Sequence, residues 1–314
     1  MTNLTKFTER DIPDLSGYVA IVTGGNSGIG YETANQLALH NARVYIASRS
    51  QARVQEAIDT MAKAANKTLD VRFLQLDLQD LKSVKQAAAD FTSKEPKLDI
   101  LINNAGVMTV PYKLTGDGFE TQWQVNYLAP HIFTTSLMPS LLSAASAAND
   151  KTRVRVVNLS SDLAVVAPGG PRKIQEDVNM TSAKGVFELM HRYAHSKQAS
   201  IRDAAEINKR YSAQGVTAYS VHPGIVNTNL QNHDNTWLGF IVRNLLKVVA
   251  RTTPLQGSYN SLFAATSPAA PAHAQGKFLM PVAKIDSRAS TWLEEDKDNA
   301  DLWEKSEAKS KEIA

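Results

Sequence analysis

The stretch YAHSK places Tyr193 and Lys197 four residues apart, which is about one turn of a helix. Side chains at this spacing lie on the same helix face, so the phenol and the ammonium group would be neighbours. A phenol with a pKa near 10 keeps its proton at neutral pH, and a nearby positive charge favours the phenolate. The pair could therefore transfer a proton. The same spacing also occurs by chance on exposed helices, so the rest of the chain has to decide between these interpretations.

A glycine-rich turn near the N-terminus predicts a second functional element. The apolar run YVAIVTG at 18–24 is typical of a buried strand, and it continues through TGGNSGIG into a helical pattern. Gly24 permits the tight turn, Gly28 lets the backbone approach a pyrophosphate, and Gly30 allows helix and strand to pack closely. The N–H groups and the positive dipole end of the helix would face the anion. An ordinary glycine-rich loop is the alternative, but this context favours nucleotide binding.

Alternating strands and helices from residue 18 to about 225 would position both elements. Apolar, β-branched runs alternate with helical segments, as in a parallel sheet whose two faces are both covered. This pattern predicts a doubly wound α/β fold of Rossmann type, with a mostly parallel seven-stranded sheet flanked by helices. The expected strands lie at 18–24, 43–48, 71–77, 98–104, 153–160, 216–222 and 276–282.

The organisation of the chain indicates a single domain, 1–314. Its 314 residues show no internal repeat and no long linker rich in proline, glycine or serine, and α/β domains often reach this length. The core would span about 17–228 and 254–284. A segment at about 229–253 would be an insertion, and the charged end at about 300–314 a tail.

The composition excludes several classes of protein. Apolar residues make up 43% and charged residues 21%, which is typical of a soluble globular protein. A net charge of +3 without a long basic block argues against a nucleic-acid partner. The absence of cysteine excludes disulfides and thiolate chemistry, and no histidine or carboxylate spacing suggests a metal site. Without a secretory signal or an apolar run of ~20 residues, no transmembrane segment is expected, and we expect a cytoplasmic protein.

The motifs of the chain, taken in order, resemble those of the short-chain dehydrogenase/reductase family. The glycine turn has the family's spacing T-G-x-x-x-G-x-G, and NNAG follows the fourth expected strand. Further along come QVNYLAP, VVNLSSDLA, YAHSK and HPGIVNT. The resemblance covers nearly the whole chain and favours the catalytic interpretation of YAHSK. It implies a catalytic set of Asn126, Ser161, Tyr193 and Lys197.

The resemblance also implies a chemical role for each of these residues. Tyr193 would be the general acid and base, while Lys197 and the oxidised nicotinamide's charge lower its pKa. Ser161 would hydrogen-bond the carbonyl oxygen, with Ser160 as the alternative. Asn126 would hold a water that links Lys197 to solvent. The cofactor contributes the hydride.

The cofactor is expected to be NADP(H). The second expected strand ends in Ala-Ser-Arg-Ser, without the carboxylate that binds the ribose of NAD. The guanidinium of Arg49 could hold a 2′-phosphate through two parallel hydrogen bonds, helped by Ser48 and Arg53; an arginine that merely ends the strand in solvent is the alternative. The residues expected to bind the cofactor are Gly24, Ser27, Gly28, Ile29, Gly30, Arg49, Asp77, Leu78, Asn104, Ala105, Gly106, Tyr193, Lys197, Pro223, Gly224, Val226 and Thr228.

Three further stretches are similar to the retinol-dehydrogenase-like branch of the family: the insertion APGGPRKIQEDVNMTSAKGVFELM, TPLQGSYNSLFAAT and LWEKSE. No N-terminal membrane anchor like that of many retinol dehydrogenases is expected, and DIPDLSG before the glycine turn is more similar to soluble fungal members. The segment 229–253 would form the substrate lid. A helix at 237–250 could instead pack on the core or another subunit, or lie on a membrane surface. The apolar residues of the lid suit an apolar ketone or aldehyde: Leu230, Trp237, Leu238, Phe240, Ile241 and Leu245.

We therefore expect an NADP-dependent carbonyl reductase or alcohol dehydrogenase acting on a small molecule, and the resemblance is compatible with a homo-oligomer. One alternative is a catalytically idle NADP-binding sensor or scaffold. Another is a C=C reductase that uses the same tyrosine and lysine to protonate carbon. The complete catalytic set favours turnover over the sensor. His195 and His222 are expected to be structural.

Overall fold

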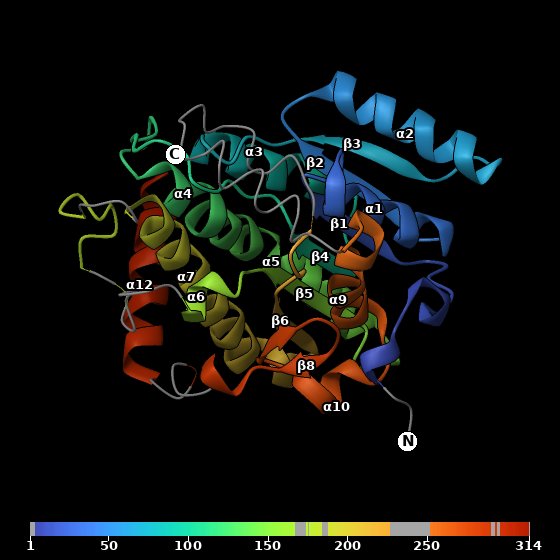
Figure 1. Cartoon of the computed structure of the whole chain (residues 1–314). Coiled ribbons are helices and arrows are strands. Elements are labelled where there is room, and N and C mark those ends of the chain that lie inside the picture. The colour runs from blue at the N-terminus through green and yellow to red at the C-terminus, as the bar shows by residue number, and fades with distance from the viewer. Residues whose placement is uncertain are drawn as a thin grey trace.

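A computed structural model of the chain (Figure 1) describes residues 4–166, 174, 176–183, 188–226, 252–289, 293 and 296–313. A single sheet runs through it in the order β3-β2-β1-β4-β5-β6-β7-β8. Thr228 and the lid residues from Leu230 to Leu245 lie outside the described residues. The strands are β1 Val19–Thr23, β2 Arg43–Ser48, β3 Val71–Gln75, β4 Ile100–Asn103, β5 Val154–Leu159, β6 Val216–Val221, β7 Phe278–Met280 and β8 Lys284–Ile285.

The strand order confirms the expected doubly wound fold. Neighbouring strands from β3 to β7 are parallel. β1 pairs with β2 on one side and with β4 on the other, so the order of connection reverses between β1 and β4. At such a switch point the loops that leave the carboxyl ends of the two strands diverge and open a crevice for a ligand.

The expected number of seven strands is one too few. The additional strand β8 pairs antiparallel with β7, after a turn in which Ala283 has a φ of 58°. It is two residues long, and both are exposed. A pair this short shows neither an apolar run nor an alternation, so the sequence carried no signal for it.

Helices cover both faces of the sheet (Figure 1). Alternate residues of the strands supply the two apolar layers, with Ile21 in one and Ala20 and Val22 in the other. Helices α3, α5, α7 and α12 pack against the first layer, and α1, α2, α9 and α10 against the second. The helices are α1 Gly28–Leu39, α2 Gln51–Ala65, α3 Leu81–Thr92, α4 Thr121–Trp123, α5 Ala129–Ala147, α6 Leu163–Val166, α7 Glu188–Tyr211, α9 Pro254–Thr266, α10 Ala270–Ala274 and α12 Asp296–Glu312, with a π-helical turn at Gln124–Leu128 and short 3₁₀ turns at Leu4–Lys6, Glu9–Asp11, Ser212–Gln214 and Ser287–Ala289.

Local sequence explains where several helices begin. The side chain of Ser50 accepts a hydrogen bond from the backbone at the start of α2, and that of Asp80 does so at α3. Thr253 and Gln256 form a reciprocal capping box at α9. Each of these caps satisfies N–H groups that a helix leaves unpaired in its first turn. Within the described residues, no helix has the length and apolar character needed to cross a bilayer.

Candidate active site

The glycine turn joins β1 to α1 at the switch point. Gly24 and Gly28 have φ values of 66° and 56°, in the left-handed region that favours glycine. A Cβ at Gly30 would lie 2.4 Å from Asn104 Nδ2 and 2.5 Å from the carbonyl oxygen of Gly24. The first turn of α1 is therefore packed directly on the two loops that follow β1 and β4.

The N-terminus of α1 differs from those of α2, α3 and α9 because no side chain caps it. Ser27 precedes the helix with extended backbone angles, and its side chain accepts no hydrogen bond from the first turn. The N–H groups of this turn and the positive end of the helix dipole lie together at the switch point. This arrangement suits an anion such as the pyrophosphate of a dinucleotide.

The end of β2 presents polar groups beside the glycine turn. Ser48 Oγ donates a hydrogen bond of 3.0 Å to Asn26 Oδ1, which ties this strand end to the turn. Arg49 follows and is exposed. At the end of β3 the carboxylate of Asp77 accepts a hydrogen bond of 2.9 Å from the backbone N–H of Gln79. The sequence did not indicate Asn26, and no family motif marked its pairing with Ser48.

The NNAG segment connects β4 to both neighbouring strands. Asn103 Nδ2 donates to Asn158 Oδ1 of β5 at 2.8 Å. Asn104 Nδ2 donates to the carbonyl oxygen of Thr23 at 2.8 Å, and the backbone N–H of Ala105 donates to Thr23 Oγ1 at 2.9 Å. The loop that follows β4 is thereby fixed against the end of β1. The carbonyl oxygen of Leu78, after β3, accepts a hydrogen bond of 3.3 Å from Gln124 Nε2, at the first residue of the π turn.

Tyr193 and Lys197 are buried on α7, so the alternative of a solvated helix turn is wrong. Their exposed fractions are 5% and 4%. Lys197 Nζ lies 5.8 Å from the centre of the Tyr193 ring and donates a hydrogen bond of 2.7 Å to the carbonyl oxygen of Leu159. Burial raises the pKa of Tyr193 to about 12, in the direction opposite to the lowering expected from Lys197, although a hydrogen bond with the side chain of Ser161 acts against the rise. Burial lowers the pKa of Lys197 to about 8.

The two serines after β5 have different partners. Ser160 Oγ donates to the carbonyl oxygen of Lys197 at 2.7 Å, which attaches the strand end to α7. Ser161 Oγ accepts a hydrogen bond of 3.3 Å from the backbone N–H of Leu163 and also pairs with Tyr193. The structure therefore brings Ser161, rather than Ser160, to the phenol.

Asn126 lies in the π turn and connects two parts of the site. Its side-chain amide pairs with both backbone groups of Val107, at 2.8 and 2.9 Å, just beyond the NNAG segment. Nδ2 also donates to Ser196 Oγ at 3.0 Å, and Ser196 Oγ donates to the carbonyl oxygen of Tyr193. Ser200 Oγ donates to the carbonyl oxygen of Asn126 at 3.0 Å. Sequence reasoning missed Ser196, although it lies within YAHSK.

The two histidines near the site have structural contacts. The ring of His195 stacks on Trp123, with the centroids 4.6 Å apart. The backbone N–H of His222 donates to the carbonyl oxygen of Leu279, which joins β6 to β7. Burial lowers the pKa of both imidazoles to about 4. Both rings are therefore neutral at physiological pH.

The segment after β6 packs against α9. Pro223 precedes Gly224, whose φ is 90°, and Val226 forms a bridge with Thr252. A Cβ at Gly257 would lie 2.6 Å from Val226 Cγ2, so this glycine lets α9 approach the loop. Gly257 was not predicted as part of the site. A glycine inside a helical pattern was the available signal.

Comparison with known proteins identifies the family and supports the fold. Residues 18–170 match the family model described as short chain dehydrogenase. The chain is 41% identical to the short-chain dehydrogenase/reductase drtF of Aspergillus calidoustus over 87% of each chain. It is 39% identical to retinol dehydrogenase 12 of Mus musculus, over 80% of this chain and 74% of the relative. A crystal structure of an uncharacterized Mycobacterium paratuberculosis protein superposes with a TM-score of 0.70 at 29% identity, covering 97% of both chains.

Proposed function

The chain belongs to the short-chain dehydrogenase/reductase family, in its retinol-dehydrogenase-like branch, and we propose that it is an NADP(H)-dependent enzyme that interconverts a carbonyl compound and an alcohol. The observation that supports this most strongly is the buried group of Ser161, Tyr193 and Lys197 at the carboxyl edge of the sheet. A phenol hydrogen-bonded to a hydroxyl, with an amine one helical turn away, is suited to move a proton to or from a substrate oxygen.

Tyr193 would donate the proton when a carbonyl is reduced. With a pKa raised to about 12 by burial, the phenol holds its proton at neutral pH and is ready to give it to a developing alkoxide. Ser161 would hydrogen-bond the same oxygen and stabilise its charge. Lys197, whose pKa is lowered to about 8, is largely protonated at pH 7 and favours the phenolate left behind. A bound dinucleotide would supply the hydride.

Several features fit a dinucleotide at the switch point. The uncapped N-terminus of α1 offers N–H groups to the pyrophosphate. A Cβ at Gly106 would lie 3.4 Å from Lys197 Nζ, so this glycine keeps open the space beside the amine. Arg49 is exposed at the end of β2, where it could hold a 2′-phosphate. The neighbouring Ser48 and Asn26 are neutral, so neither side chain repels a phosphate. We therefore propose NADP rather than NAD.

The substrate is proposed to be apolar. Four of the large apolar side chains that are exposed in the described residues lie in segments that follow β4, β5 and β6. These segments leave the carboxyl edge of the sheet, where Tyr193 also lies. Exposed apolar side chains at the edge of the sheet that carries a polar site are suited to binding an apolar ligand. The four residues are Tyr112, Leu114, Val166 and Ile225.

The test is NADPH consumption by the purified protein with a panel of aldehydes, ketones and quinones, and with NADH in parallel. We expect turnover with NADPH, and a loss of roughly 10²- to 10⁴-fold in the Tyr193→Phe variant. The control is Tyr211→Phe, which makes the same change at the other end of α7 and should leave turnover unchanged. Equal activity of Tyr193→Phe and the wild type would refute the proposed proton donor. A preference for NADH would refute the role of Arg49.

A further inference from the structure

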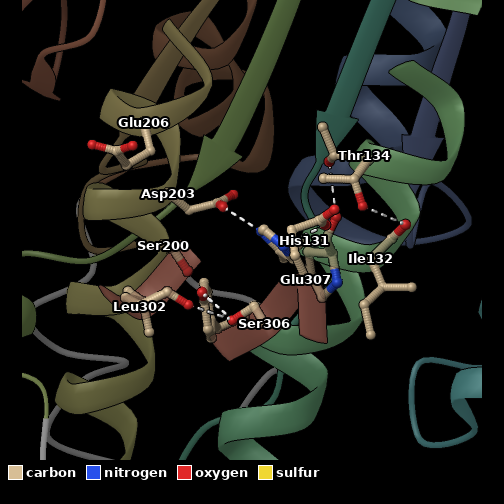
Figure 2. A network of polar contacts seen from close by, with 12 residues as sticks. His131, Ile132, Thr134, Ser200, Asp203, Glu206, Leu302, Ser306 and Glu307 are labelled. Carbon is tan, nitrogen blue, oxygen red and sulfur yellow. Dashed lines mark hydrogen bonds and ion pairs between the residues drawn. The ribbon is translucent and has the colours of Figure 1, made fainter. Parts of the chain in front are cut away.

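A buried histidine links the three helices α5, α7 and α12 (Figure 2). His131 of α5 has no exposed side-chain surface. Its Nδ1 lies 2.7 Å from Asp203 Oδ1 on α7, and its Nε2 lies 3.1 Å from Glu307 Oε1 on α12. Because an ionised carboxylate can only accept a hydrogen bond, both ring nitrogens must donate. Only the protonated imidazole can do this, so the junction is an imidazolium between two carboxylates.

Hydrogen bonds extend from this junction to the strands that carry the site. The second oxygen of Asp203 accepts a hydrogen bond of 3.0 Å from Asn158 Nδ2 on β5. Asn158 Oδ1 in turn accepts from Asn103 Nδ2 on β4 at 2.8 Å. Asn103 immediately precedes the loop that packs on the glycine turn, and Asn158 lies three residues before Ser161. The junction is thus connected to both strand ends through buried polar groups.

The π turn that carries Asn126 is connected to the same helices. The hydroxyl of Tyr127 pairs with Ser306 Oγ of α12 at 2.7 Å. Ser200 Oγ of α7 donates to the carbonyl oxygen of Asn126 at 3.0 Å. A π turn leaves the regular helical hydrogen-bond pattern, so its geometry depends on contacts of this kind. α12 therefore contacts the π turn through Ser306 and contacts His131 through Glu307.

We propose that His131 and Glu307 are positioning residues of the reaction, through which α12 holds α5 and α7 in the relative placement that the catalytic side chains require. This inference rests on the proposed function, because it assumes that Asn126, Tyr193 and Lys197 act together. Without the carboxylate of Glu307, the buried imidazolium has one partner fewer, and the neutral ring, which donates through one nitrogen only, becomes favoured. The placement of α7 against the π turn then loosens. Displacements of about 1 Å can reduce catalysis roughly 100-fold.

The charges around the ring support this assignment. Burial would lower the pKa of His131, but Asp203 and Glu307 outweigh it and raise the pKa to about 9. The hydrogen bond from His131 lowers the pKa of Glu307. The strands that face the ring contribute neutral amides. Other charged side chains on the helices packed against the junction include Arg202 of α7, which is fully buried and donates a hydrogen bond of 2.7 Å to Asn299 Oδ1 on α12. They also include Glu206, which pairs with Arg210 on α7, and Lys311 on α12.

The test compares Glu307→Gln with Glu304→Gln, which makes the same change on an exposed position of α12. We expect kcat to fall roughly 10- to 100-fold in Glu307→Gln, with KM for NADPH within about twofold of the wild type, because the glycine turn and Arg49 are untouched. Ring NMR should show a lower pKa of His131, and the alkaline limb of the kcat profile should move with it. Glu304→Gln should behave as the wild type. Glu307→Asp, which keeps the charge, should recover part of the loss.

Hydrogen exchange of the backbone amides at 124–131 and 193–203 provides a measurement that does not need turnover. Exchange should accelerate in Glu307→Gln and not in Glu304→Gln. An unchanged kcat profile and unchanged exchange, despite a shifted titration of His131, would overturn the inference. An inactive wild-type protein would instead refute the proposed function, and the inference would then be decided by the exchange measurement alone.

Discussion

Replacing His131 with asparagine should remove a contribution to stability that depends strongly on pH. The pKa of the ring is about 9 in the folded protein, against 6.5 for an unperturbed histidine. At 1.36 kcal/mol per pH unit, the difference between these values corresponds to roughly 3 kcal/mol of stabilisation. The imidazole is fully buried, but 31% of the Glu307 side chain is exposed. Solvent screens that pair, so the value is an upper estimate.

The pH range follows from the direction of the shift. The folded protein binds this proton more tightly than the unfolded chain does, so the stabilisation is complete below about pH 6.5. It declines as the pH rises and is lost above about 9. Burial lowers the pKa of Lys197 to about 8, and this group therefore acts in the opposite sense over part of the same range. The pH dependence of the wild type alone would mix the two effects.

Urea unfolding of the wild type and His131→Asn at pH 6 and pH 9.5 separates them, because Lys197 is present in both proteins. The variant should be less stable at pH 6, and the difference in unfolding free energy should shrink by up to about 3 kcal/mol at pH 9.5. The loss that remains at the higher pH measures the packing of the ring. A difference that is the same at both pH values, within about 0.5 kcal/mol, would refute the assignment of an imidazolium at this site.

Three further changes test the candidate site. Arg49→Ala should weaken NADPH binding about 10- to 100-fold by removing a charge-assisted hydrogen bond, and should leave NADH binding unchanged; fluorescence titration measures both. Gly30→Ala should lower the unfolding free energy by about 1–3 kcal/mol and weaken NADPH binding, because its Cβ would lie 2.4 Å from Asn104 Nδ2. Gly116→Ala is the control, since a Cβ there meets nothing within 4 Å. Ser161→Ala should lower kcat about 10²- to 10³-fold while KM for NADPH is retained; an unchanged kcat would argue against its contact with the substrate oxygen.

Much of the fold could be predicted because its elements carry strong local signals. The expected strand at 43–48 coincides with β2, and the residues at 51–65, whose apolar positions have the period of a helix, form α2. Both have apolar residues at the period of their element. β8 escaped prediction because its pairing with β7 depends on a turn at Ala283, not on a pattern within its two residues.

The candidate site could be predicted where its residues lie in contiguous motifs. The glycine turn, NNAG and YAHSK each follow an element of the fold, so their place at the carboxyl edge of the sheet follows from the topology. Asn26, Gly257 and His131 were missed for a common reason. Each acts through a contact with a residue distant in sequence, such as the 72 positions between His131 and Asp203. Only the folded chain brings such partners together.

The junction at His131 combines a modest net stabilisation with strict geometry. Burying one imidazolium between two carboxylates carries a desolvation penalty, and apolar side chains of similar volume could stabilise the same interface as well. Apolar contacts, however, permit helices to slide and rotate at little cost, whereas hydrogen bonds of 2.7 and 3.1 Å fix the positions of particular atoms. α7 carries Tyr193 and Lys197, and the π turn that contains Asn126 leads directly into α5. Atomic placement of these two helices matters more to proton transfer than added stability would, which is why we assign the junction to positioning.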